Sequence, residues 1–182
     1  MIDTTTIKRY YLRNWVDRSQ AARKAAEELA KKEVRPSLRD LHKNDINEEL
    51  VFVLAGHKVE FKDENEKKPD GDVYLTYDEA LKCQKDGWRL PTEEELRALC
   101  CISYRLDPRI GYAVFDKRLV LPVYGYRGNS GVYYVGEKGY YWSSEVYGLD
   151  SAWTLKFTLA GAGTTHCFQR HGLSVRLVRD VK

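Results

Sequence analysis

Gly139-Tyr-Tyr-Trp-Ser-Ser144 opens the most informative stretch of this 182-residue chain, and two blocks follow it, Ser151-Ala-Trp-Thr-Leu-Lys-Phe157 and Gly172-Leu-Ser-Val-Arg-Leu-Val-Arg179. Apolar and polar residues alternate in the two later blocks, which is the period of a strand with one buried and one solvated face. Most of the thirteen tyrosines lie between residues 104 and 147. Tyrosine offers a large contact area and a hydrogen-bonding tip at low entropic cost, so this region predicts a binding surface.

Working outward, two short helices are predicted before this stretch. Thr76 and Thr92 each precede a glutamate by three residues, and this spacing forms a capping box whose Ncap contributes about 1 kcal/mol. We therefore expect helices over residues 77–85 and 93–100. A hairpin is predicted earlier still, with strands at 50–54 and 57–61 that turn at Ala55-Gly56. Residues 62–72 are charged and contain Pro69 and Gly71, so we expect a solvated loop there.

The first 47 residues differ in composition from the rest. Asp17-Arg18-Ser19-Gln20 resembles a capping box, an alanine-rich run to Val34 follows, and Pro36 stops the pattern. Oppositely charged pairs four residues apart support this helix by about 0.3 kcal/mol each. We expect residues 1–47 to form a helical arm, which either covers one side of the domain or docks the protein into an assembly. Residues 48–182 are expected to form the ligand-binding domain.

Composition and element order limit the class of protein. Helices come first and short antiparallel strands afterwards, which is typical of an α+β domain. The net charge of +3 arises from basic residues spread along the chain, so the pattern does not favour nucleic acid. Four cysteines include an adjacent pair and no Cys-x-x-Cys spacing, which favours reduced thiols. No apolar run reaches the length of a signal peptide core or a membrane span, so we expect a protein made in the cytosol without membrane insertion.

Several ordered motifs carry a family resemblance. Gly87-Trp-Arg-Leu-Pro-Thr-Glu-Glu-Glu-Leu96 follows Tyr77-Asp-Glu-Ala-Leu-Lys-Cys83, and Leu121-Pro-Val-Tyr-Gly-Tyr-Arg127 precedes the blocks at 139–144 and 172–179. Together these motifs resemble the fibrobacter-type major paralogous domain, also called the Lcl C-terminal-like domain, and the variable proteins of diversity-generating retroelements. The resemblance implies a C-type lectin-like fold with two short helices and a C-terminal antiparallel β region. It also implies constant framework motifs with diversified, ligand-binding residues between them.

The predicted ligand-binding surface combines aromatic anchors with adaptable polar groups on strands and loops near the C-terminus. Its residues are Tyr133, Glu145, Tyr147, Leu149, Asp150, Thr164, His166, Phe168, Gln169 and His171. The alternative is that these positions are ordinary solvated loop and strand residues, with Tyr133 and Phe168 partly in the core.

Framework residues are expected to have structural roles. The tryptophans Trp88, Trp142 and Trp153 are expected in the core, where Ser143 or Ser144 would accept an indole N–H. The arginines Arg89, Arg176 and Arg179 are expected to pair internally with carboxylates such as Glu94 or Glu95.

Metal binding and catalysis are not expected. His166-Cys167-x-x-x-His171 offers three ligands, but no further Cys or His lies nearby in sequence to complete a tetrahedral site, so we predict no metal and no cofactor. Formylglycine-generating enzymes carry a similar Arg-Leu-Pro-Thr-x-x-Glu word and use a late pair of cysteines, whereas only Cys167 occurs late in this chain. Adjacent strand residues point to opposite faces, so His166 would point away from Cys167.

The function expected from the sequence is therefore non-catalytic ligand recognition or display. The ligand would be a protein or a glycan on a surface, and the triplets of calcium-dependent sugar sites are missing, so a sugar would bind by stacking and direct hydrogen bonds. Two settings fit, a bacteriophage virion adhesin and a cytosolic bacterial protein, with the arm building a homo-oligomer or larger assembly. The alternatives are a structural decoration or assembly protein of a virion, and a relative of the formylglycine-generating oxidoreductases.

Overall fold

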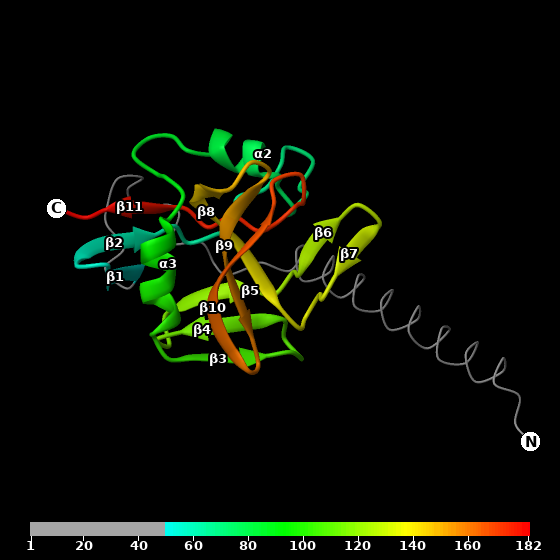
Figure 1. The fold of residues 1–182 in the computed structure, drawn as a ribbon. Helices are drawn as coiled ribbons and strands as arrows, with labels where there is room; N and C mark the ends of the chain where they lie inside the picture. Colours follow the sequence, from blue (N-terminus) through cyan, green and yellow to red (C-terminus); the bar gives the residue numbers. More distant parts are fainter. Residues whose placement is uncertain (1–49) are drawn as a thin grey trace, which may run out of the picture. The chain divides into compact units, whose positions relative to one another are not determined.

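Strands dominate the part of the chain that the computed structural model describes, residues 50–182 (Figure 1). Of these residues, 47% lie in strands or bridges and only 11% in helices. The predicted α+β class with a C-type lectin-like fold is therefore wrong. The two capped helices are short, and residues 104–133, where β structure was expected only from Lys117, contribute five strands. The predicted helical arm, residues 1–47, lies outside the described residues.

The elements of residues 50–182 follow one another in this order: β1 (Val51–Leu54), β2 (His57–Phe61), α2 (Tyr77–Lys82), α3 (Glu93–Cys100), β3 (Tyr104–Asp107), β4 (Tyr112–Phe115), β5 (Leu119–Pro122), β6 (Tyr126–Gly128), β7 (Gly131–Tyr133), β8 (Gly139–Tyr147), β9 (Ser151–Thr158), β10 (Gly161–Phe168) and β11 (Val178–Asp180). The strands form small antiparallel sheets with the orders β1-β2-β11, β10-β9-β8, β3-β4-β5 and β6-β7. Figure 1 shows the β6–β7 hairpin projecting away from the other sheets.

The predicted hairpin at residues 50–61 is confirmed. Strands β1 and β2 pair from Val51 opposite Glu60 to Leu54 opposite His57. Ala55 and Gly56 both have positive φ, 49° and 83°, as a two-residue hairpin turn with the twist of the flanking strands requires. Near the other end of the chain, β11 pairs with β2, so the two ends of the described region share one sheet.

The two capping boxes predicted at Thr76 and Thr92 are confirmed. Thr76 accepts the N–H of Glu79, and the Glu79 carboxylate accepts the N–H of Thr76; Thr92 and Glu95 repeat the arrangement at α3. Helix α2 ends at Lys82, earlier than predicted, and the chain then turns through positive φ at Asp86 and Gly87. Helix α3 packs against β9 and β10 and thereby covers part of the central sheet.

The β10-β9-β8 sheet separates two apolar clusters. On one face, Leu155 and Phe157 join the cluster that includes residues of α3; on the other, Trp142 and Ala152 pack with the segment around Leu173. The ring of Phe157 packs against Gly139, where no side chain blocks it; a Cβ at this position would lie 2.0 Å from the ring. The sheet is therefore covered on both faces at its centre.

This double burial corrects the predicted alternation. Thr154 was expected on a solvated face, but it is fully buried and donates to the carbonyl of Thr165. Residues 172–177 form no strand before β11, with single bridges at 172–174 only, and every one of them is buried, including Ser174 and Arg176. An alternating pattern predicts a solvent-exposed face only where no second layer of the structure covers the sheet.

The predicted solvated loop at residues 62–72 is partly wrong. Asn65 is buried, and its Oδ1 accepts a hydrogen bond from Arg176 Nε at 2.8 Å. Arg176 also donates to the carbonyls of Lys62 and Asp63 at 2.8 and 2.7 Å. Arg176 therefore bonds to amide groups at the start of this loop and holds that part of the chain against the core.

Candidate functional site

The best candidate site lies at the end of the β8–β9 hairpin, where three aromatic side chains meet. The rings of Tyr147 and His166 stack with centroids 4.1 Å apart and planes 13° apart. Trp153 contacts Tyr147 edge to face at 4.8 Å. We call Tyr147, Trp153 and His166 the hairpin patch. Offset or perpendicular aromatic contacts of this kind are favourable, so the rings hold one another in place.

A bulge in β8 positions these rings. Trp142 pairs with Thr154 and Val146 pairs with Ala152, so residues 143–145 lie opposite Trp153 alone. Extra residues on one strand bend it and redirect its side chains. Ser143 stabilises the bulge by accepting the N–H of Glu145 through its hydroxyl at 3.2 Å. The bulge therefore separates the buried first half of β8 from its exposed second half.

Large side chains at this end of the hairpin are solvated. Leu149 at the turn is 101% exposed and Tyr147 of the patch is 44% exposed. Val146 is 60% exposed as well, but it pairs with Ala152 and points to the opposite face of the sheet. The turn itself uses Gly148 with φ of 69°. Exposed apolar groups that gather on one hairpin of a rigid sheet are typical of an interaction site.

Carboxylates border the patch on the side of α3. Glu145 accepts the main-chain N–H of Glu93 at 3.0 Å, and Glu93 in turn accepts the hydroxyl of Thr164 at 2.7 Å. Arg97 completes the arrangement with three hydrogen bonds to Glu93. Burial favours the protonated acid, but the bonds from Arg97 and Thr164 outweigh it and lower the pKa of Glu93. Helix α3 thus places the ionised carboxylate of Glu93, paired with Arg97, next to β10.

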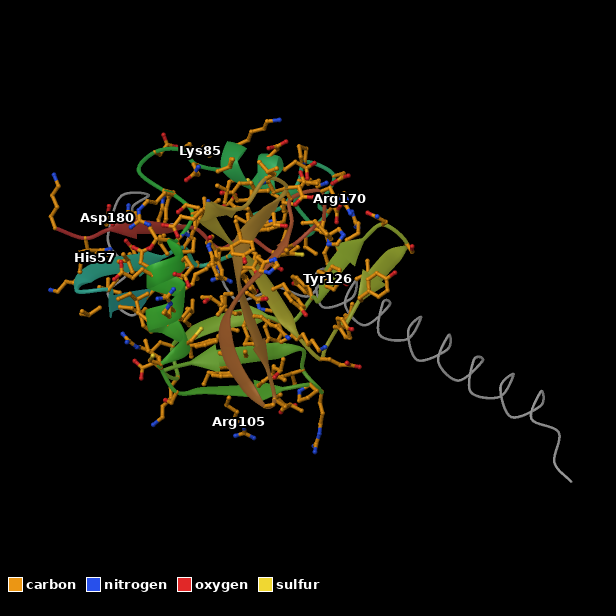
Figure 2. The ribbon with its side chains drawn as sticks, viewed as in Figure 1. His57, Lys85, Arg105, Tyr126, Arg170 and Asp180 are labelled. Carbon is orange, nitrogen blue, oxygen red and sulfur yellow. The ribbon has the colours of Figure 1, made fainter. Side chains whose placement is uncertain are left out.

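A second aromatic group surrounds Tyr126, labelled in Figure 2. Tyr126 contacts the rings of Tyr133, Tyr134, Tyr140 and His171 at centroid distances of 5.4, 6.1, 5.3 and 5.5 Å. We call these five residues the tyrosine cluster. Burial raises the pKa of Tyr140 to about 12 and also raises the pKa of Tyr126. The phenols of Tyr126 and Tyr140 are therefore neutral, and the rings of the cluster largely contact one another.

The two aromatic groups lie on opposite faces of the β10-β9-β8 sheet. His166 and Cys167 are neighbours on β10, and neighbouring side chains point to opposite faces. His166 contacts the hairpin patch, whereas Cys167 Sγ lies 3.4 Å from His171 Nδ1 in the tyrosine cluster. The single surface predicted from the sequence is therefore divided into two.

The predicted residues are distributed between these two groups. Tyr147, His166, Glu145 and Thr164 come together in or beside the hairpin patch. Tyr133 and His171 belong to the tyrosine cluster.

The remaining predicted residues lie at the ends of the strands. Leu149 and Asp150 form the β8–β9 turn, and Phe168 contacts His171 edge to face at 5.5 Å. Gln169 has a structural contact, because its side chain donates to the carbonyl of Ser151 at 3.0 Å.

Sequence reasoning missed two members of the site. Trp153 was assigned to the core with Trp142, yet only Trp142 is fully buried; its indole N–H donates to the carbonyl of Leu75 at 2.8 Å rather than to a neighbouring serine. Trp88 is also only partly buried, with Arg179 over its ring. Glu93 was read only as part of a helix start. No local signal in the sequence distinguishes Trp153 and Glu93, because both depend on what packs across the sheet.

Two framework arginines pair with carboxylates as predicted. Arg89 donates to both carboxylate oxygens of the fully buried Glu95, at 2.8 and 2.6 Å, and to Asp180 at 2.6 Å. Arg179 pairs with Glu60 at 2.6 Å. Burial opposes ionisation of Glu95, but its hydrogen bonds, first that from Arg89, outweigh this and lower its pKa.

The same network contains a geometric candidate for a metal site. Ligand atoms of His57, Glu95 and Asp180, of which His57 and Asp180 are labelled in Figure 2, lie within 4.8 Å of one another. The guanidinium of Arg89 already supplies the cation between Glu95 and Asp180. A metal ion would have to displace it, so the arrangement favours a structural ion-pair network.

The Cys167–His171 pair is poorly suited to nucleophilic chemistry. Burial raises the pKa of the Cys167 thiol to about 11. Burial also lowers the pKa of His171, so the imidazole is neutral near pH 7. A reactive cysteine requires a stabilised thiolate, commonly beside a cation, and this environment favours the neutral thiol.

Comparisons with known proteins add no assignment. No family model matches the chain, and searches of curated proteins and of solved structures return no match. Within residues 50–182, no helix has the length and apolar character needed to cross a bilayer.

Proposed function

We propose that the β-rich region binds a protein or glycan ligand without catalysis, and that the hairpin patch is the centre of the contact. One observation carries the proposal: the stacked pair of Tyr147 and His166, braced by Trp153, lies at the end of the β8–β9 hairpin, where Tyr147 is partly exposed and Leu149 of the turn is fully exposed. Tyrosine and tryptophan dominate the energetics of many binding surfaces because they lose little conformational entropy there.

The setting of the patch supports binding rather than chemistry. Its rings stand on the second half of β8 and on two long strands of eight residues each, β9 and β10. A rigid sheet keeps such anchors in one geometry before the ligand arrives, which lowers the entropic cost of association. The neutral Cys167 thiol, on the opposite face, offers no activated nucleophile to the patch.

The motif resemblance points the same way. In proteins that display diversified residues, the constant motifs form the scaffold and the residues between them contact the ligand. Here the motifs at 139–144 and 172–179 are largely buried, whereas the residues between them include the exposed hairpin turn. We therefore propose that the ligand contacts residues between these two motifs.

A matched pair of variants tests the proposal. Tyr147 and Tyr134 are almost equally exposed, at 44% and 43%, but belong to different aromatic groups. The full chain would be screened against an array of defined glycans and a display library of random peptides, and the retained probes would be titrated. Tyr147→Ala and His166→Ala should weaken binding by about thirtyfold, which corresponds to about 2 kcal/mol at a hot spot.

The control outcome is equally specific. Tyr134→Ala should leave the affinity for the same probes unchanged, since Tyr134 contacts Tyr126 and Lys138 rather than the patch. Binding that depends on Tyr134 but not on Tyr147 would reject the patch. If neither array nor library yields a binder, the alternative of a structural or assembly protein takes its place.

A further inference from the structure

Strand β10 is the outer strand of the β10-β9-β8 sheet. The main-chain groups of β10 that point to the free edge can be deduced from the hydrogen bonds that β8 makes on its side away from β9. Trp142 N–H donates to the carbonyl of Ser174, and Ser174 N–H donates to the carbonyl of Tyr140, both at 3.1 Å. The main-chain groups of Tyr140 and Trp142 therefore point away from β9. Since these groups alternate from side to side along a strand, those of Tyr141 point toward β9.

The same alternation can be followed across the sheet. Tyr141 lies opposite Leu155, so Leu155 faces β8 and its neighbour Thr154 faces β10. Thr154 lies opposite Thr165, whose carbonyl also accepts the Thr154 hydroxyl at 3.2 Å. Thr165 thus faces β9, and the next residues on either side of it face outward.

Three residues of β10 consequently present main-chain N–H and C=O groups at the edge. They are Ala162, Thr164 and His166, and no hydrogen bond from another residue of 50–182 reaches these groups. Residues 161–168 contain neither proline nor a charged side chain, which are the usual protection of an exposed edge. An edge of this kind is a template for one more strand.

The side chains next to this edge indicate what the added strand would carry. The side chains of Thr164 and His166 lie on the same face of the sheet as the hairpin patch. The Thr164 hydroxyl donates to the Glu93 carboxylate, and the main-chain N–H of Glu93 donates to the Glu145 carboxylate. Arg97 already pairs with Glu93, but the charges of Glu94 and Glu145 also act on Arg97, so this group is negative overall. A basic side chain on an incoming strand would be attracted to it. A second copy paired about Thr164 would instead bring two such negative groups together, which is unfavourable.

We propose that the β10 edge takes up an extended segment of a partner protein as an additional strand, with a Lys or Arg of that segment facing the net negative group around Glu145. This rests on the proposed function and deepens it, because it makes the ligand a polypeptide rather than a glycan. Main-chain hydrogen bonds to Ala162, Thr164 and His166 would supply affinity. The hairpin patch would contact alternate side chains of the segment and so provide specificity.

Thr164→Pro tests the edge directly in the full chain. The Thr164 N–H points outward, so proline removes an edge donor without breaking the β9–β10 ladder. Thr164→Val is the matched control, because it removes the hydroxyl bond to Glu93 and keeps the N–H. The probes are random peptides of about twelve residues selected by display on the wild-type chain.

The expected result has three parts. Selected peptides carry a Lys or Arg, Thr164→Pro weakens their binding about tenfold, and Thr164→Val changes it by less than about threefold. Binding also slows hydrogen exchange at the amides of Ala162, Thr164 and His166 in the wild-type chain. This last measurement decides the matter if the proline variant does not fold.

Other results would overturn the proposal. Peptides that bind Thr164→Pro as tightly as wild type, or that leave these three amides unprotected, would exclude the edge. Slow exchange at these amides without peptide would mean that the edge is already covered, by a second copy if sedimentation gives a dimer and by the chain's own N-terminal residues if it gives a monomer. Glycan binders that require Tyr147, with no peptide binder, would leave the proposed function standing and reject a polypeptide ligand.

Discussion

The hairpin patch and the tyrosine cluster flank the same sheet, are both rich in aromatic residues, and differ in what their rings touch. In the tyrosine cluster, Tyr126 is surrounded by four other rings. In the hairpin patch, the Tyr147–His166 stack lies next to the solvated β8–β9 turn, where Leu149 is fully exposed. Aromatic density in a sequence therefore marks two kinds of region, one that satisfies its own contacts and one that leaves them open to a partner.

Local backbone geometry shows the same contrast. Tyr134 in the tyrosine cluster has φ of 58°, a conformation that is unfavourable for a bulky residue and persists only where the surroundings impose it. Nearby, Gly125 has φ of 68°, and a Cβ there would lie 1.8 Å from the carbonyl oxygen of Tyr133. In the hairpin patch the positive φ falls on Gly148, where an added Cβ would meet no atom within 4 Å. The cluster is thus tightly constrained, and the patch is open.

The largest expected difference is between the two tryptophans that the sequence presents as equals. Trp142→Ala should lower the free energy of unfolding by about 4 kcal/mol, because it removes a fully buried ring and its bond to the Leu75 carbonyl. Trp153→Ala should cost only about 1 kcal/mol, since the ring is partly exposed. Urea unfolding of both variants measures this, and equal losses would show that Trp153 is a core residue after all.

A smaller difference is expected between the two groups of tyrosines. Tyr126→Ala should lower the free energy of unfolding by about 2 kcal/mol, because it removes the ring at the centre of the tyrosine cluster. Tyr147→Ala should lower it by less than about 0.5 kcal/mol, as expected for an exposed position. The same urea titrations apply. A Tyr147 variant as unstable as the Tyr126 variant would contradict the division into scaffold and contact surface.

The smallest expected effect is a pH dependence within the tyrosine cluster. Burial, and then the charge of Arg170, lower the pKa of His171 from its ordinary value of 6.5, so the unfolded chain binds this proton more readily than the folded one. The contribution of His171 to stability is therefore complete above pH 6.5 and is lost as the pH falls below it.

His171→Phe provides the comparison, because it keeps a ring beside Tyr126 and removes the titration. Between about pH 7.5 and about pH 5, the wild type should lose roughly 0.5 kcal/mol more stability than this variant, a figure reduced for the partial exposure of the ring. Identical losses in the two proteins would assign the acid sensitivity to other groups.

Much of the local structure could be predicted from the sequence. The hairpin at Ala55-Gly56 and both capping boxes are confirmed, because each depends on contacts between residues a few positions apart. The pairing of Arg89 with Glu95 followed from two residues near each other in the chain. The predicted surface included both Tyr147 and His166, although their stacking required the bulge in β8 to bring them together.

The errors arose where a distant segment covers a surface. Thr154 and Arg176 looked like solvated strand positions, yet both are buried by segments that lie far away in the sequence. The predicted fold class failed for the same reason. Helices of six and eight residues have clear start signals, but their weight in the fold depends on how many strands the rest of the chain forms.

The sequence by itself determined where helices begin, where the first hairpin turns and which stretch is rich in aromatic residues, because these properties rest on short-range hydrogen bonds and composition. Only the tertiary structure decided that Trp142 is core and Trp153 surface, that His166 and His171 serve opposite faces, and that β10 is an outer strand. Burial and strand order are sums over contacts between distant residues, and a period-two pattern carries no information about what lies across from it.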